Sequence, residues 1–280
     1  MPQAWPRFVQ RRGAVLALFA LGLLVLVALS AGVLAPHDPT EQFRDSMLQP
    51  PSWGQGRHVL GTDELGRDVL SRLLYGARLT LGIAGGAVLL AAVPGVVLGL
   101  FAAVYSRYLG VLVLRAADVL LALPSVLLAI AVVAVLGPGL LNTVLAVAVS
   151  SLPGYLRLAR ASALGELARP YVLSARAVGA GTLRLMFGIV LPNCLGPVVV
   201  AATLDFSTAI LTVAGLGFLG LGAQPPAPEW GTMLASARDS IGRAHWVVLA
   251  PGSAILLAVL CVNVVGDGLR DALDPRRRAV

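Results

Sequence analysis

Residues 171–193, YVLSARAVGAGTLRLMFGIVLPN, interrupt a chain that is otherwise largely apolar. Pro170 fits the first turn of a short helix, and Gly179 is a residue that readily ends one. A second helical piece is expected to stop at Leu191, because the residue before Pro192 disfavours the α conformation. Helices this short are marginal in water, so something must pack on them, either lipid headgroups or a soluble partner.

The composition of the rest of the chain is typical of a membrane protein. Of 280 residues, 58% are hydrophobic and 12% are charged, whereas about a quarter are charged in soluble domains. An α-helix needs about 20 apolar residues to cross a bilayer. Such runs lie at residues 13–35, 79–104, 111–136, 139–160, 193–222 and 246–266. They are continuous rather than alternating, so we predict an all-α, polytopic membrane protein with six transmembrane helices.

The distribution of arginines predicts the orientation of these spans. Six spans place both termini on one side, and the chain has 21 arginines and no lysine. Fourteen arginines fall on the side of the termini and seven on the other. The positive-inside rule therefore predicts cytoplasmic termini at residues 1–12 and 267–280. A nucleic-acid partner is not expected, because the charges do not gather on one basic face.

The longest segment outside the spans comprises residues 36–78. Its first part contains several prolines and cannot continue as one helix. Its last part offers Thr62 or Asp63 as a helix cap, followed by leucines at helical spacing. We predict a surface helix here, ahead of a five-helix core at residues 79–266. The alternative is that this stretch is the extended start of the second span.

Small residues and prolines indicate how the spans pack. Gly95 and Gly99 lie four residues apart and fit close packing between helices of one chain. Cys194 and Cys261 form no CxxC pair, so they are interpreted as small buried hydrophobes. Prolines within the spans are expected to kink them. They are Pro94, Pro124, Pro153, Pro197 and Pro251.

The opening stretch resembles the cytoplasmic EAA loop of ABC importer permeases. In that family the loop forms a coupling helix that docks into a groove on an ATPase subunit. The resemblance implies an ATPase-coupling role for Ala175, Arg176, Gly179, Ile189, Leu191 and Pro192. Two positions depart from the pattern, since Leu173 stands where the motif has Glu and Ser174 where it has its first Ala. This departure weakens the ion-pair part of the docking.

The resemblance extends over nearly the whole chain to the dipeptide, oligopeptide and nickel branch, and is strongest to the dipeptide permeases. It rests on EQFRD, LGTDELGRDVLSRLLYGARL, LALPS, LPNCLGP, GFLGLGAQPPAPEWGTML and VGDGLRDALDP. It implies a type I importer fold in a bacterial inner membrane, translocating dipeptides or short peptides, with nickel or haem as the alternative cargo. The implied partners are a homologous second permease, two ABC ATPases and an extracytoplasmic substrate-binding protein.

The absence of lysine supports this division of labour. A P-loop needs its Lys to reach the β- and γ-phosphates, so this chain cannot itself be a P-loop ATPase. We expect it not to be an enzyme and to bind no cofactor, with ATP and Mg²⁺ held by the partner ATPases. An ion-driven secondary transporter is a more remote alternative, because no repeat of paired broken helices is visible. A membrane enzyme would need convergent titratable groups, and those present are scattered in sequence.

Five polar or aromatic residues are candidates for contact with substrate or binding protein. Asp205 falls about a dozen residues into the fifth predicted span, roughly 18 Å deep. A carboxylate at that depth suggests the translocation pathway, or alternatively a packing or inter-subunit hydrogen bond. Glu229 and Trp230 lie in a Pro-rich loop that we expect to be exposed. Together with Asp63 and Arg67, they are candidates for binding-protein docking, although Trp230 could instead anchor at headgroup level.

The remaining ionisable residues are expected to have no catalytic or metal-binding role. His37, His58 and His245 do not cluster at metal-ligand spacing, so we predict solvated loop histidines and no metal site. The alternative is that the two in the outer loop contact a metal substrate.

Acidic residues near the cytoplasmic ends are interpreted as salt bridges or helix-end charges. Asp118, Asp267 and Asp271 lie close in sequence to Arg115 and Arg270.

Overall fold

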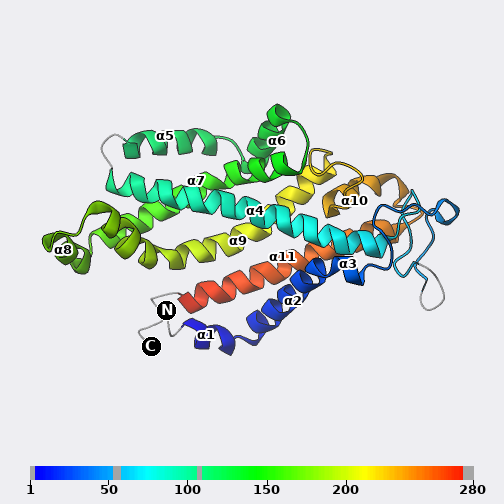
Figure 1. Cartoon of the computed structure of the whole chain (residues 1–280), viewed down its shortest axis with the longest axis horizontal. Helices are drawn as coiled ribbons and strands as arrows, with labels where there is room; N and C mark the ends of the chain where they lie inside the picture. Colours follow the sequence, from blue (N-terminus) through cyan, green and yellow to red (C-terminus); the bar gives the residue numbers. More distant parts are fainter. Residues whose placement is uncertain (1–3, 53–57, 106–108, 274–280) are drawn as a thin grey trace.

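The computed structural model describes residues 4–52, 58–105 and 109–273, and Figure 1 shows them as a bundle of long helices. Within these residues the regular elements are helical, apart from one isolated bridge between Thr62 and Asp68. The α-helices are α1 Ala4–Gln10, α2 Arg12–Leu29, α3 Ala31–Leu34, α4 Val69–Val104, α5 Leu109–Leu121, α6 Ser125–Leu136, α7 Leu140–Leu167, α8 Pro170–Ala177, α9 Leu191–Phe218, α10 Trp230–Ser236 and α11 His245–Leu273. A π-helix, η2 Arg184–Val190, precedes α9, and short 3₁₀ turns lie at Arg44–Ser46 and Arg238–Ser240.

The predicted all-α membrane fold is confirmed, but one predicted span is broken. Helices α2, α4, α7 and α11, together with η2 and α9 as one segment, are long and apolar enough to cross a membrane. The prediction of one helix at residues 111–136 is wrong, because α5 and α6 meet at an angle of 93°. The chain bends where Pro124 precedes α6, since the residue before a proline leaves the α conformation. Counting this bent pair as one span gives the six predicted.

The second span begins earlier than predicted. Helix α4 runs without a break from Val69, so the expected separate surface helix is wrong and the alternative of an extended span is correct. Neither Thr62 nor Asp63 caps it. The cap is Asp68, whose carboxylate accepts a hydrogen bond from the Ser71 amide at 2.8 Å.

The predicted stop at Pro192 is also wrong. The π-helix η2 continues directly into α9, and Pro192 lies in the first turn of α9. A proline ring clashes with the carbonyl four residues earlier in a regular α-helix. The wider π turn just before Pro192 changes that register, which accounts for the uninterrupted helix. The fifth span therefore starts at Arg184.

Helix α4 is central to the bundle and packs most extensively on α7. A Cβ atom added at Gly95 would lie 2.8 Å from Tyr155 Cβ, and one at Gly99 would lie 2.5 Å from the Leu156 carbonyl oxygen. The predicted close packing at these two glycines is thus confirmed. Cys194 and Cys261 are free and buried, as expected.

The two ends of the bundle carry different features (Figure 1). Helix α8 and both chain ends lie at one end, and α10 lies with the long segment after α3 at the other. This arrangement agrees with a shared side for the termini and α8, whereas the side itself stays a prediction. Five arginines counted for the orientation lie outside the described residues: Arg57, Arg107, Arg276, Arg277 and Arg278.

Substituting Gly99 tests the α4–α7 contact. Gly99→Ala is expected to lower the stability of the chain by about 1–3 kcal/mol, because its Cβ overlaps the Leu156 carbonyl. Gly82→Ala in the same helix is the matched control, since a Cβ there meets nothing within 4 Å. Thermal unfolding of the purified variants in detergent measures both. Equal melting temperatures for the two variants would contradict the packing described.

Candidate functional site

Helix α8 ends at a glycine whose backbone conformation is one that other residues rarely adopt. Gly179 has φ of 88°, in the left-handed region. Its amide donates to the Arg176 carbonyl at 2.9 Å, and the Ala180 amide donates to the Ala175 carbonyl at 3.0 Å. These two bonds form a Schellman cap. A side chain at this φ costs about 1–2 kcal/mol, so the turn requires glycine.

Helix α8 and the residues after it bury some of their apolar side chains and expose others. Val172 is fully buried, and Tyr171 donates a hydrogen bond to Glu166 at the end of α7, which attaches α8 to the bundle. Acceptance of that bond by Glu166 raises the pKa of Tyr171 to about 12. In contrast, Val178 is 90% exposed and Leu183 is 63% exposed. Both exposed side chains belong to the loop whose sequence resembles the coupling motif.

The second arm of the loop is packed into the bundle. Met186 and Val190 are buried in one cluster with Leu100 of α4, Ala159 of α7 and Val198 of α9. A displacement of this arm would therefore press on three spans. Some of the candidate coupling residues are half-buried and the others are exposed. Ala175, Ile189 and Leu191 are half-buried, and Arg176, Gly179 and Pro192 are exposed.

Asp205 lies within α9 and bonds to α7. Its carboxylate accepts hydrogen bonds from the Ser151 hydroxyl at 3.2 Å and the Tyr155 hydroxyl at 3.0 Å. These bonds match the packing alternative, and the side chain remains half-buried rather than enclosed. The sequence did not identify Ser151 or Tyr155 as partners, because local sequence patterns do not show which residues about fifty positions apart will be in contact.

The predicted exposure of Glu229 and Trp230 is wrong. Glu229 is 0% exposed and Trp230 is 1% exposed, so neither a direct docking contact nor a headgroup anchor fits these side chains. The Trp230 indole donates to the Leu73 carbonyl at 3.0 Å. The physical reason is that Gly76 and Gly217 have no side chains and so leave room for them. A Cβ at Gly76 would lie 2.7 Å from Trp230 Cδ1, and one at Gly217 would lie 2.3 Å from Glu229 Oε2.

The buried Glu229 carboxylate accepts three hydrogen bonds. It accepts the amides of Gly231 and Thr232, each at 2.9 Å, and thereby caps α10. It also accepts the Thr80 hydroxyl of α4 at 3.0 Å. Burial raises the pKa of Glu229, and these three donors oppose that shift. One carboxylate thus joins the loop between α9 and α10 to α4.

Asp63 and Arg67 are likewise buried, which corrects their assignment to an exposed docking surface. They are 6% and 7% exposed. The Asp63 carboxylate pairs with the Arg67 guanidinium at 2.7 Å and with that of Arg72 at 3.5 Å. Arg72, which the sequence did not single out, also donates to the Pro39 carbonyl at 2.9 Å. These three charged residues line a cavity of about 260 Å³ near α10.

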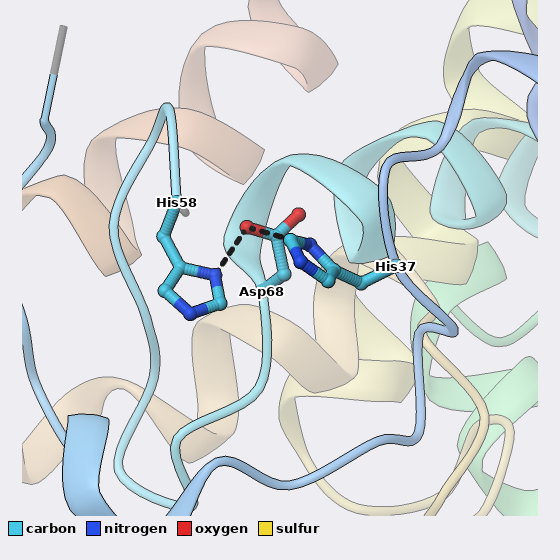
Figure 2. Close-up of side chains that lie close together, drawn as sticks. All are labelled: His37, His58 and Asp68. Carbon is cyan, nitrogen blue, oxygen red and sulfur yellow. Dashed lines mark hydrogen bonds and ion pairs between the residues drawn. The ribbon is translucent and has the colours of Figure 1, made fainter. Parts of the chain in front are cut away.

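The prediction that the histidines do not cluster is wrong for two of the three. His37 and His58 converge on Asp68, as Figure 2 shows. His58 is 2% exposed, so it is not a solvated loop residue. His245 is exposed and lies outside this cluster. Sequence spacing could not reveal the cluster, because its three residues come from separate segments.

Two of the three carboxylates predicted to form salt bridges at the helix ends do so, but with residues of other segments. Asp118 pairs with Arg157 of α7, and Asp271 of α11 pairs with Arg11. Proximity in sequence to Arg115 and Arg270 did not identify these partners.

The fold and the chain's sequence match a family of transport proteins. Residues 95–279 match the binding-protein-dependent transport system inner membrane component, and residues 2–51 match the N-terminal transmembrane domain of oligopeptide transport permease C. The chain therefore belongs to the binding-protein-dependent ABC importer permeases, as its resemblance indicated. It is a multi-pass inner membrane protein.

Individual relatives agree with this assignment. The di/tripeptide transport system permease protein DppC of Pseudomonas aeruginosa is 58% identical over 99% of this chain and 92% of its own length. The dipeptide permease DppC of Escherichia coli K12 is 50% identical over 99% and 93%. The glutathione permease GsiD of Pectobacterium atrosepticum is 42% identical over 98% and 91%.

A solved structure shares the fold. The inward-facing MetNI methionine ABC transporter gives a TM-score of 0.60 at 20% identity, covering 73% of this chain and 97% of the other.

Removing the Glu229 carboxylate tests its structural role. Glu229→Ala leaves three donors, two of them buried, without an acceptor and removes the cap of α10, which is expected to cost about 3 kcal/mol. Glu64→Ala, at an exposed glutamate of the same end of the bundle, is the control and should change stability by less than about 0.5 kcal/mol. Thermal unfolding measures both. A wild-type melting temperature for Glu229→Ala would refute the role of this carboxylate.

Proposed function

We propose that the chain is the permease subunit through which an ATP-driven, binding-protein-dependent importer moves dipeptides or short peptides into the cytoplasm. The observation that carries this proposal is the 58% identity, over 99% of the chain, with a di/tripeptide permease. The glutathione permease among the relatives supports the same substrate class, because glutathione is itself a tripeptide. Reconstitution with the partner subunits and uptake of labelled dipeptide test the proposal. Absence of peptide uptake by an assembly that imports nickel or haem would overturn it.

Under this proposal, the partner ATPases contact residues 170–192, and their conformational change displaces this loop. The exposed apolar side chains Leu173 and Val178 suit a groove on another protein, and Leu173 replaces the family's Glu by an apolar contact. Movement passes through the buried Met186 and Val190 to α4, α7 and α9. ATP and Mg²⁺ are held by two partner ATPase subunits, and the loop and both termini are cytoplasmic.

The remaining partners are assigned to other faces. Apolar side chains of the bent pair α5–α6, such as Leu112, Val119 and Val135, are 70–85% exposed and suit contact with a homologous second permease or lipid. An extracytoplasmic binding protein would land on the opposite end, around α10. The buried Asp63, Arg67, Glu229 and Trp230 would hold that end in shape rather than touch the binding protein.

Substitution of Gly179 tests the coupling role. Gly179→Val should reduce peptide uptake by about tenfold or more, because a β-branched residue at this φ strains the turn. Peptide binding by the external protein should remain intact. Gly181→Val is the matched control, since Gly181 lies in the same loop with open space around it and without positive φ. Wild-type uptake by Gly179→Val would count against the coupling role.

Under the same proposal, the Asp205 carboxylate faces the translocation pathway in addition to bonding to α7. Asp205→Asn removes the charge but keeps an oxygen for Tyr155 or Ser151, so the helix contact is largely preserved. Uptake should fall by roughly 10- to 100-fold if the charge contacts a polar or cationic part of the substrate. Uptake is measured at equal membrane insertion. A normally inserted variant that transports at the wild-type rate would leave only the packing role.

A further inference from the structure

Three side chains from separate segments meet at the outer end of α4. Figure 2 shows His37, from the segment after α3, and His58, from the following loop, on either side of Asp68. Asp68 Oδ1 lies 3.0 Å from His58 Nδ1 and 3.9 Å from His37 Nδ1. One ligand atom of each residue lies within 4.8 Å of the others. The arrangement brings three potential ligand atoms, two nitrogens and an oxygen, around one point.

The carboxylate is held in a fixed orientation. Its other oxygen, Oδ2, accepts the Ser71 amide at 2.8 Å and the Ser71 hydroxyl at 2.7 Å. Oδ1 is therefore left facing the histidines. The same Ser71 hydroxyl accepts the backbone amide of His37 at 3.1 Å. Partners of this kind, which orient metal-binding side chains, are common around metal sites.

Two nitrogens of the cluster are buried without a hydrogen-bond partner among the described residues. They are His37 Nδ1 and His58 Nε2. Buried polar atoms without a partner are rare and call for an explanation. The Phe43 ring packs on both imidazoles, with centroids 5.1 and 5.0 Å away, and limits access of water. A proton on His58 Nδ1 can satisfy its contact with Asp68, but at 3.9 Å His37 Nδ1 makes no such bond.

A cation held by His37 Nδ1, His58 Nδ1 and Asp68 Oδ1 would give His37 Nδ1 the partner that it lacks, whereas His58 Nε2 lies on the far side of its ring. Two imidazoles and one carboxylate form a donor set that suits Zn²⁺, whereas Ca²⁺ and Mg²⁺ prefer oxygen ligands. We propose that His37, His58 and Asp68 bind one Zn²⁺ ion and that this ion ties His37 and His58 to Asp68 at the start of α4. Water would take the remaining position.

A bound Zn²⁺ ion would stabilise a segment that has little regular secondary structure. Between α3 and α4 the described residues contain one 3₁₀ turn and an isolated bridge as their regular structure. Zn²⁺ bound to the folded state alone would stabilise that state by mass action. The site concerns the stability of the outer end and is independent of which solute is carried.

Metal content tests the site directly. The full-length chain, purified with a tag that contains no histidine and stripped with a chelator, is dialysed against Zn²⁺ alone. Elemental analysis should find one Zn²⁺ per chain in the wild type and less than a tenth of that in His37→Ala and His58→Ala. His245→Ala is the matched control and should keep one Zn²⁺. Added Zn²⁺ should raise the melting temperature of the wild type and of His245→Ala only.

A measurement on the wild-type chain tests the site even if the histidine variants do not fold. X-ray absorption of the zinc-loaded wild type should show imidazole nitrogen and oxygen ligands at about 2.0–2.2 Å. Ser71→Ala should weaken Zn²⁺ binding by about 10-fold, because the carboxylate loses the hydroxyl, one of the two donors that orient it. A wild type without bound Zn²⁺, a His58→Ala variant that retains a full equivalent, or absorption without imidazole ligands would each overturn the proposal.

Discussion

Close packing of α4 on α7 is the constraint on which the other contacts of the chain depend. In lipid the hydrophobic effect does little to bring helices together, so dispersion at short range must do so. Gly95 and Gly99 permit that approach, because any side chain there would overlap α7. Helix α4 is also continuous over 36 residues, so its two ends are mechanically connected. A displacement of one end of α4 would therefore move the other.

The two ends of α4 are attached to different loops. Near one end, Leu100 packs with Met186 and Val190 of the loop that follows α8. Near the other end, Thr80 and Gly76 hold Glu229 and Trp230. Movement of packed helices as rigid bodies is an established route for transmitting a conformational change. The proposed coupling through residues 170–192 would use this connection between the α8 end and the α10 end.

Buried carboxylates organise the end of the bundle that carries α10. Asp63, Asp68 and Glu229 are each at most 6% exposed, and each accepts backbone amides that offset the cost of burial. Sequence reasoning placed Asp63 and Glu229 on the surface because charged residues in loops usually lie there. Here they instead connect loops to α4. Two of the three buried side-chain atoms without a partner in the described residues belong to His37 and His58, which sets that cluster apart.

The sequence by itself determined the membrane class, the approximate position of five spans, the glycine turn at Gly179 and the family. These features depend on composition, local periodicity and the conformational range of single residues, all of which are local. Only the tertiary structure decided the continuity of η2 and α9 through Pro192, the burial of Glu229 and the convergence of His37 on Asp68. Each of these depends on atoms placed by packing rather than by neighbouring residues. No pattern along the chain encodes such distances, because folding sets them through contacts between distant segments.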